Sequence, residues 1–545
     1  MTTGSHEAGR SVGQRIASVL ATIVLALYLV ILALDLFVDR RVRYWGSDSN
    51  VPLAPNWVLF ALVVGVVVVV LAIRRRRQPK AGGACVQPPH AARRYTLAAL
   101  VATLALLCYQ AASFKYAGFY SGWDTGAIRG AVLLPSPLSQ SLPKDAGLYF
   151  YFSTYPNNIF LVIVLRAEEV IRQALFPWIA IRAFLAYVSI VLVSASFFIF
   201  TRISGRLLPR GPFPWTANAI FFVLVGLSPW YMIPYSDTYS LFFCTLMLCV
   251  ATRTKPSLVA AIVLGVLGGI AYNIKPTCIF VVLATIVAWL LTDLRRGTAA
   301  AVLKRVGAVI ASLILTLCIV SLAVGSLGIT WNKNARFGMT HFAMMGLNKE
   351  TDGVFSQQDV NASIAEPNVD ARKQMNLRVI RERLAAYGPA GLLRHEGKKT
   401  LVSFNDGTFA WTAEGHFFLM PHHGSFGEKT NFFRSYIYPK GYYKGPNFYT
   451  VFCTVEQTLW LVCLAGIPLC LLARRAGQPA GRHAAQGSDA GARTSWVIMI
   501  FTIGAMALFL MVFEARSRYL YLYSGYFVLV GVHGLQLLGA HISGK

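Results

Sequence analysis

Long apolar segments alternate with short polar ones over most of the chain. A membrane-spanning helix needs roughly 20 apolar residues, and this pattern predicts an all-α polytopic membrane protein. We predict about twelve transmembrane helices, two of them short, at 16–36, 57–73, 95–113, 178–201, 214–232, 237–252, 257–274, 277–292, 303–326, 449–473, 494–513 and 518–538.

Two longer stretches separate these segments. The first, 114–177, includes a run at 158–173 that is apolar first and charged later, which predicts a helix lying on or dipping into the membrane. The second, 327–448, has mixed polarity and helical periodicity around 366–387, and long loops between spans are usually functional. We divide the chain into four parts. Residues 1–94 form two extra N-terminal spans with a basic linker, and residues 95–326 form a transmembrane core whose outer loop, 114–177, is catalytic. Residues 327–448 form a mixed outer domain, and residues 449–545 form C-terminal spans with a linker at 474–493.

Composition agrees with a membrane protein. Hydrophobic residues make up 56% of the chain and charged residues 13%, whereas a soluble domain carries about 25% charged residues. The net charge of +27 comes mainly from Lys and Arg in alternate short loops, as at 74–77 and 295–305. The positive-inside rule then places both termini in the cytoplasm and both long stretches outside the plasma membrane. Nucleic acid is therefore not an expected partner.

Ionisable residues at the outer ends of the predicted spans are candidates for chemistry, because a charge near membrane depth is costly unless it is paired or used. Three carboxylates and three cations fall there, namely Asp124, Asp237, Lys275, Glu514, Arg516 and Arg518. A general base beside a phosphate clamp needs such a set. Each residue also has a plainer interpretation, since Asp caps helices and Arg and Lys anchor spans at the interface.

Metal and cofactor chemistry is not indicated. His416, His422 and His423 do not match a recognised ligand spacing, so we favour aromatic-rich packing over a metal site for this segment. The nine cysteines include no Cys-x-x-Cys pair. We expect no cofactor.

Seven short stretches, in order, give the chain a resemblance to a known superfamily. They are Gly122-Trp-Asp-Thr125, Tyr151-Phe-Ser-Thr-Tyr-Pro-Asn-Asn158, Pro234-Tyr-Ser-Asp-Thr238, Lys275-Pro-Thr277, Thr340-His-Phe-Ala-Met-Met-Gly-Leu-Asn348, Asn405-Asp-Gly-Thr-Phe409 and Glu514-Ala-Arg-Ser-Arg-Tyr519. From about residue 95 to residue 540 the chain resembles the GT-C superfamily of integral membrane glycosyltransferases, in particular the bacterial, protein-mannosyltransferase-like branch of glycosyltransferase family 39. The two segments before residue 95 depart from that pattern.

The resemblance implies a GT-C-type fold and a polyprenyl-phosphate-linked sugar donor. The sugar would pass, with inversion, to an extracytoplasmic cell-wall glycan, glycolipid or protein. Asp124 would be the general base, Asp237 a second acidic candidate, and Lys275, Arg516 and Arg518 would bind the donor phosphate. Contacts to sugar or acceptor would come from Trp123, Tyr155, Asn157, Asn158, His341 and Glu514. A donor without a nucleotide diphosphate needs no bridging metal.

Two other functions fit the same pattern of spans. A transporter or flippase for lipid-linked sugars would share the outward-facing cations, but it needs neither Asp124 as a base nor a long outer domain. A polymerase or ligase that takes whole glycans from lipid diphosphates would carry an Arg-dominated outer loop without the early Asp.

Overall fold

The structure, a computed structural model, describes residues 11–38, 53–77, 91–119, 121–208, 211–253, 256–295, 297–412, 431–439, 447–472 and 486–542. All regular elements within these ranges are helices, which confirms the polytopic helical protein that the sequence predicts. The outer domain, expected to be mixed, is also helical where it is described.

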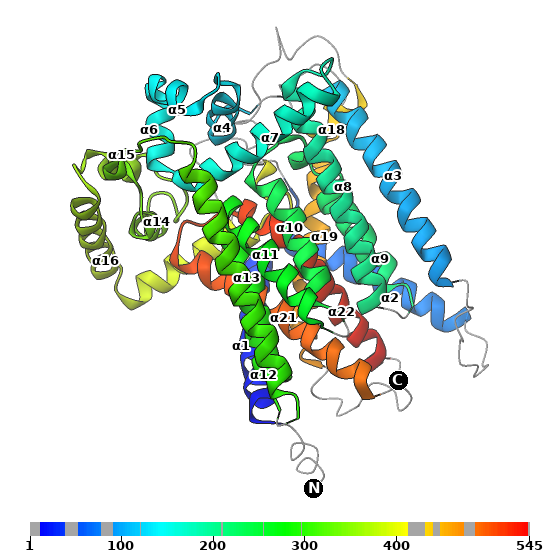
Figure 1. Cartoon of the computed structure of the whole chain (residues 1–545). Coiled ribbons are helices and arrows are strands. Elements are labelled where there is room, and N and C mark those ends of the chain that lie inside the picture. The colour runs from blue at the N-terminus through cyan, green and yellow to red at the C-terminus, as the bar shows by residue number, and fades with distance from the viewer. Residues whose placement is uncertain are drawn as a thin grey trace.

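Seven helices of the described chain are long and apolar enough to cross a membrane. They are α1 (Val12–Phe37), α3 (Ala91–Ala117), α8 (Ile181–Leu207), α13 (Ala299–Gly325), α19 (Tyr449–Leu469), α21 (Gln486–Val512) and α22 (Ser524–Ile542) with the preceding turn η7 (Ser517–Tyr523). Figure 1 shows them side by side in one bundle.

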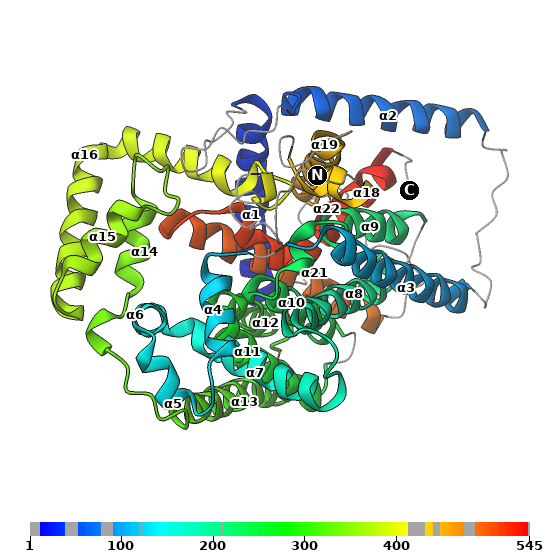
Figure 2. The ribbon, with the colours of Figure 1, turned by 90° about the horizontal axis from the view of Figure 1, so that it is seen from above.

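Shorter apolar helices occupy the other five predicted segments. They are α2 (Asn56–Arg77), α9 (Phe213–Phe221) with the π turn η3 (Phe222–Gly226), α10 (Ser236–Ala251), α11 (Leu258–Ile274), and α12 (Ile279–Thr292) with the preceding turn η5 (Pro276–Cys278). Figure 2, which looks down the bundle, shows α2 lengthwise along one edge of the molecule. This helix therefore lies across the bundle direction.

Small residues bring two of the core helices into close contact. Gly265 and Gly269 of α11 face α13. A side chain at 265 would collide with Val309 and Ser312, and one at 269 would collide with Thr316. Glycines four residues apart on one helix face permit this close backbone approach in membranes. The neighbouring helix α12 continues into α13 through the short turn at 293–298, so these two helices start from the same level.

A layer of short helices covers one end of the bundle (Figure 1). It comprises α4 (Asp124–Leu133), α5 (Leu138–Ser141), η1 (Leu142–Lys144), α6 (Ala146–Thr154), η2 (Pro156–Asn158) and α7 (Ile159–Leu175). The chain bends by 99° between α6 and the segment Pro156–Leu175. The amphipathic run predicted at 158–173 is thus a helix, and it lies across the ends of the bundle helices.

Beside this layer stands a helical group that we call the outer unit, residues 333–404. It contains η6 (Lys333–Ala335), α14 (Met339–Gly346), α15 (Gln357–Ala365) and α16 (Val369–Phe404), and the short α18 (Phe432–Ile437) lies apart from it against α3. A buried ion pair between Arg383 and Asp359, 2.6 Å apart, ties α16 to α15. α16 includes the periodic stretch 366–387 from Val369 onward and bends at Gly388, where φ is 56°.

Candidate functional site

Proline places one of the predicted cations at a break between two short helices. Lys275 follows the end of α11 and precedes Pro276, the first residue of η5. The proline ring disfavours helical geometry in the residue before it, and Lys275 is extended, with φ −151° and ψ 113°. The chain then returns as α12. Lys275 is therefore held at the tip of a helical hairpin.

Asp237 lies at the centre of a buried group of charges. It belongs to the first turn of α10 and is 1% exposed. The Lys275 ammonium contacts Oδ1 of Asp237, and Nε of Arg518 in η7 lies 3.7 Å from Oδ2. Breaking a buried pair by removing one partner is costly. The three residues therefore fix the relative positions of α10, the α11–α12 hairpin and η7.

Asp124 lies next to these ion pairs and is only partly buried. It is the first residue of α4, Trp123 is the N-cap residue, and no side chain caps this helix. Oδ2 of Asp124 instead accepts a hydrogen bond of 3.0 Å from the hydroxyl of Tyr235. Asp237 likewise makes no capping bond, because the N-cap of α10 is Tyr235. The capping interpretation is therefore wrong for both carboxylates.

Aromatic rings join Asp124 to the ion pairs. The Arg518 guanidinium lies 4.2 Å from the ring centroid of Trp123, and the rings of Trp123 and Tyr235 meet edge to face at 4.9 Å. Burial, and next the charge of Asp124, raise the pKa of the Tyr235 phenol, so it stays a neutral donor to the carboxylate. We call Trp123, Asp124, Tyr235, Asp237, Lys275 and Arg518 the charged cluster.

A second ion pair borders this cluster. Nε of Arg516 lies 2.9 Å from Oε1 of Glu514, and the Tyr519 hydroxyl donates to the same oxygen over 3.3 Å. The Lys275 ammonium lies 4.7 Å from the centroid of the Tyr519 ring. Tyr519 thus connects Lys275 to the Arg516–Glu514 pair, and the structure brings all six predicted ionisable residues together.

The other predicted contacts differ in their distance from the cluster. Tyr155 is close, since burial, and then the charges of Asp124 and Glu514, raise the pKa of its phenol. Asn158 donates a 2.7 Å hydrogen bond to the Tyr151 hydroxyl, and Asn157 donates to Asn158 over 3.2 Å. The two asparagines therefore order the bend between α6 and α7 on which Tyr155 lies.

His341 is not part of the charged cluster. It is completely buried in the outer unit, where its Nδ1 lies 2.7 Å from Oγ of Ser363. The centroid of its ring lies 4.0 Å from that of Phe337, with the planes tilted by 35°, and the Phe337 ring meets Tyr155 edge to face at 5.4 Å. His341 therefore stands one layer behind Tyr155 and supports it through Phe337.

We expect the outer unit to lose stability on acidification because of His341. Burial lowers the pKa of His341 to about 4; the charge of Asp359 opposes this shift and that of Arg372 adds to it, both more weakly than burial. An unfolded histidine titrates near 6.5, so protons favour the unfolded chain as the pH falls from 6.5 to 4, at about 1.4 kcal/mol per pH unit. The protection factors of α14 and α15, in which the pH dependence of intrinsic exchange is divided out, should fall over this range and stay level above it. In His341→Gln the fall should be absent, and an unchanged fall in that variant would contradict the assignment.

Sequence reasoning missed a residue that holds the loop of Arg518 in place. Asp406, in the turn after α16, accepts hydrogen bonds from the backbone N–H of Ala410 (2.7 Å) and the hydroxyl of Ser517 (3.1 Å). The Asn405-Asp-Gly-Thr-Phe409 stretch was noted, but the bond to Ser517 spans 111 residues. Tyr235 was missed for the same reason. The only sequence feature that pointed to Tyr235 was its position, directly after Pro234 and two residues before Asp237.

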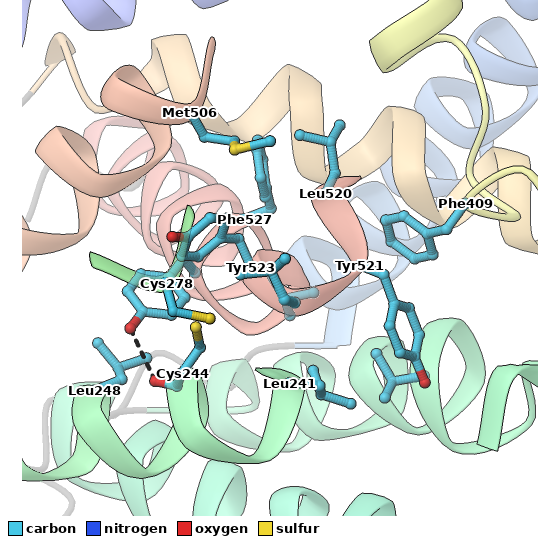
Figure 3. Close-up of a cluster of buried hydrophobic side chains, with 14 of the residues drawn as sticks. Leu241, Cys244, Leu248, Cys278, Phe409, Met506, Leu520, Tyr521, Tyr523 and Phe527 are labelled. Carbon is cyan, nitrogen blue, oxygen red and sulfur yellow. Dashed lines mark hydrogen bonds between the residues drawn. The ribbon is translucent and has the colours of Figure 1, made fainter. Parts of the chain in front are cut away.

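Packed aromatic side chains support η7 from beneath. Figure 3 shows Tyr521 and Tyr523 of η7 on the side of Leu241 and Cys244 of α10, with Phe527 of α22 beside Met506 of α21. All six are fully buried. The position of Arg518 is thus fixed by a rigid core.

No group of three His, Cys, Asp or Glu side chains in the described part of the chain is arranged to hold a metal ion. His416, His422 and His423 lie outside the described residues.

Comparison with known proteins identifies the chain at the level of its family. No curated protein matches it. No solved structure matches it either. The model of one family, described as "conserved hypothetical integral membrane protein", matches residues 16–536. The chain therefore belongs to this family of integral membrane proteins.

Proposed function

We propose that the chain is an inverting membrane glycosyltransferase of the GT-C type. It moves a sugar from a polyprenyl phosphate to an extracytoplasmic glycan, lipid or protein. The observation that supports this best is that a partly exposed carboxylate, Asp124, hydrogen-bonded by Tyr235, directly follows Trp123, whose ring contacts the guanidinium of Arg518. A base and an anion-binding group within one cluster are what such a transfer needs.

The step balances with the residues of the cluster. The acceptor hydroxyl loses its proton to Asp124 as its oxygen attacks the anomeric carbon. The bond from that carbon to the phosphate oxygen breaks, and the lipid phosphate leaves with the electron pair. Arg518 and Lys275 stabilise the developing negative charge, in a site where burial strengthens such interactions. Tyr235 orients the carboxylate by its hydrogen bond.

The geometry favours Asp124 over Asp237 as the base. Asp237 is buried, and its two oxygens already face Lys275 and Arg518, so neither is open to an acceptor hydroxyl. Asp124 is partly exposed and is hydrogen-bonded by a neutral phenol. We therefore assign Asp124 to proton transfer and Asp237 to the positioning of the cations.

A donor-consumption assay tests the proposal. The full chain in lipid nanodiscs is given radiolabelled polyprenyl-phosphate mannose, galactose, glucose or arabinofuranose with membrane extract as the acceptor source. We expect release of polyprenyl phosphate from at least one donor. Movement of the intact donor across a proteoliposome membrane, without cleavage, would instead show a transporter. Cleavage of lipid diphosphate donors alone would show a polymerase or ligase.

The proposal also includes cytoplasmic termini and an extracytoplasmic cluster in the plasma membrane. We expect a membrane-impermeant maleimide to label Lys373→Cys of the outer unit in intact cells. Gly297→Cys, in the turn between α12 and α13, should react only after permeabilisation. Both positions are exposed, and Cys85, Cys108 and Cys318 are replaced by Ala in the background. Labelling of residue 373 only from the cytoplasm would reverse the orientation.

A further inference from the structure

The bend of α16 presents an uncharged surface within a charge-rich helix. Residues 384–393, Leu384-Ala-Ala-Tyr-Gly-Pro-Ala-Gly-Leu-Leu393, contain no ionisable side chain except Tyr387, whereas Arg381, Glu382 and Arg383 precede them and Arg394 follows. Leu384 is 40% exposed and Leu393 is 76% exposed. The remaining exposed residues of the stretch are also apolar, namely Ala385, Ala386, Pro389 and Ala390.

The inner side of the bend is firmly held, so the apolar surface has a fixed direction. The Tyr387 hydroxyl donates to the carbonyl of Leu347 over 3.1 Å and lies 3.0 Å from Nδ1 of His395. Nε2 of His395 lies 2.9 Å from the carbonyl oxygen of Gly346. These bonds anchor both halves of the bend to the loop after α14. Leu393 lies two residues before the inward-facing His395, on the opposite side of its half of the helix, and is turned away from the outer unit; Leu384, three residues before Tyr387, lies at the edge of the contact and is 40% exposed.

The position of the bend indicates what covers it. Figure 1 shows it at the lower edge of the outer unit, beside the bundle rather than beyond its end. Figure 2 places it at the periphery of the molecule, away from the core helices. A surface in this place, apolar at its centre and flanked by exposed arginines, has the composition of a helix that lies in a membrane interface.

We propose that the bend of α16 is seated in the bilayer surface. Leu384 and Leu393 enter the boundary between headgroups and acyl chains, and Arg381 and Arg394 bind the phosphates of anionic lipids. The outer unit is then held at a fixed height beside the charged cluster. This inference does not depend on the reaction that the protein catalyses.

Depth-dependent quenching tests the proposal. Leu393→Cys and, as the matched control on the same helix, Lys373→Cys are labelled with an environment-sensitive fluorophore, in the background without Cys85, Cys108 and Cys318. Both proteins are studied in nanodiscs that contain anionic lipid. We expect lipids brominated near the headgroup to quench the label at 393 and aqueous iodide to quench it several-fold less than the label at 373. Equal iodide quenching at both positions would overturn the proposal.

The same measurement separates other occupants of the surface. Protection from iodide without quenching by brominated lipid would mean that a second copy or another protein covers the bend, and would refute the lipid assignment.

The role of charge is tested by Arg394→Gln combined with Arg381→Gln. We expect the wild-type residues to give stronger bromolipid quenching in anionic than in zwitterionic lipid, and the double variant to lose this difference. If bromolipid quenching in the protein with both arginines were the same in anionic and zwitterionic lipid, the role of the arginines would be contradicted.

Discussion

Asp124→Asn should abolish most sugar transfer while leaving the fold intact. The amide keeps the shape of the side chain, and its oxygen still accepts the bond that Tyr235 donates to Oδ2 of Asp124. It cannot accept the proton of the acceptor hydroxyl. We expect donor consumption to fall at least about 100-fold, the usual contribution of a positioned base. The melting temperature should change little, because Asp124 caps no helix.

Asp145→Asn is the matched control for this variant. The Asp145 carboxylate is exposed and caps α6, accepting a 2.9 Å hydrogen bond from the backbone N–H of Leu148. Asparagine caps a helix as well as aspartate does, so activity and stability should both be retained. A fully active Asp124→Asn protein would remove the proposed base and leave Asp237 as the next acid to test.

Arg518→Ala should weaken donor use more than it weakens the fold. A charge-assisted contact to phosphate is worth about 1.5–3 kcal/mol, which corresponds to a loss of roughly 10- to 150-fold in kcat/KM. Lys275 still neutralises Asp237 in this variant, so a folded protein is expected. The measurement is kcat/KM for the donor, with the melting temperature taken on the same sample.

Arg516→Ala provides the comparison. Arg516 pairs with Glu514, and its guanidinium lies 5.9 Å from the ring centroid of Phe355, whereas Arg518 contacts Trp123, the neighbour of the proposed base Asp124. We therefore expect a smaller loss from Arg516→Ala, and partial recovery in Arg518→Lys. Unchanged donor kinetics in Arg518→Ala would place the phosphate at Lys275 or elsewhere.

The sequence predicted where the helices lie, because runs of apolar residues alone determine which segments enter a bilayer. It did not predict their directions. The apolar stretch of α2 resembles those of the other spans, yet α2 lies across the bundle (Figure 2), and the direction of a helix depends on its neighbours rather than on its own hydropathy.

The charged cluster was also predictable only in outline. Charges at the outer ends of spans must gather at one membrane surface, so Asp237, Lys275 and Arg518 were expected on the same side. Their pairing was not, because it depends on the extended backbone of Lys275 and on the packing beneath η7. His341 was expected at the sugar. Its apolar neighbours along the chain gave no sign that Phe337 would separate it from Tyr155.

The unequal lengths of α12 and α13 create a hydrophobic mismatch within a single hairpin. α12 with η5 has 17 residues and α13 has 27, so the two rise about 27 Å and 40 Å from their shared turn. Lys275, at the outer end of the shorter helix, thus lies roughly 13 Å below the end of α13. Leu322, near that end, is 74% exposed, as is expected of a side chain in contact with acyl chains. The Lys275 side chain itself is 12% exposed and contacts Asp237 and the ring of Tyr519. Neighbouring protein rather than acyl chains therefore covers the end of α12, and the mismatch between the two helices is taken up inside the protein.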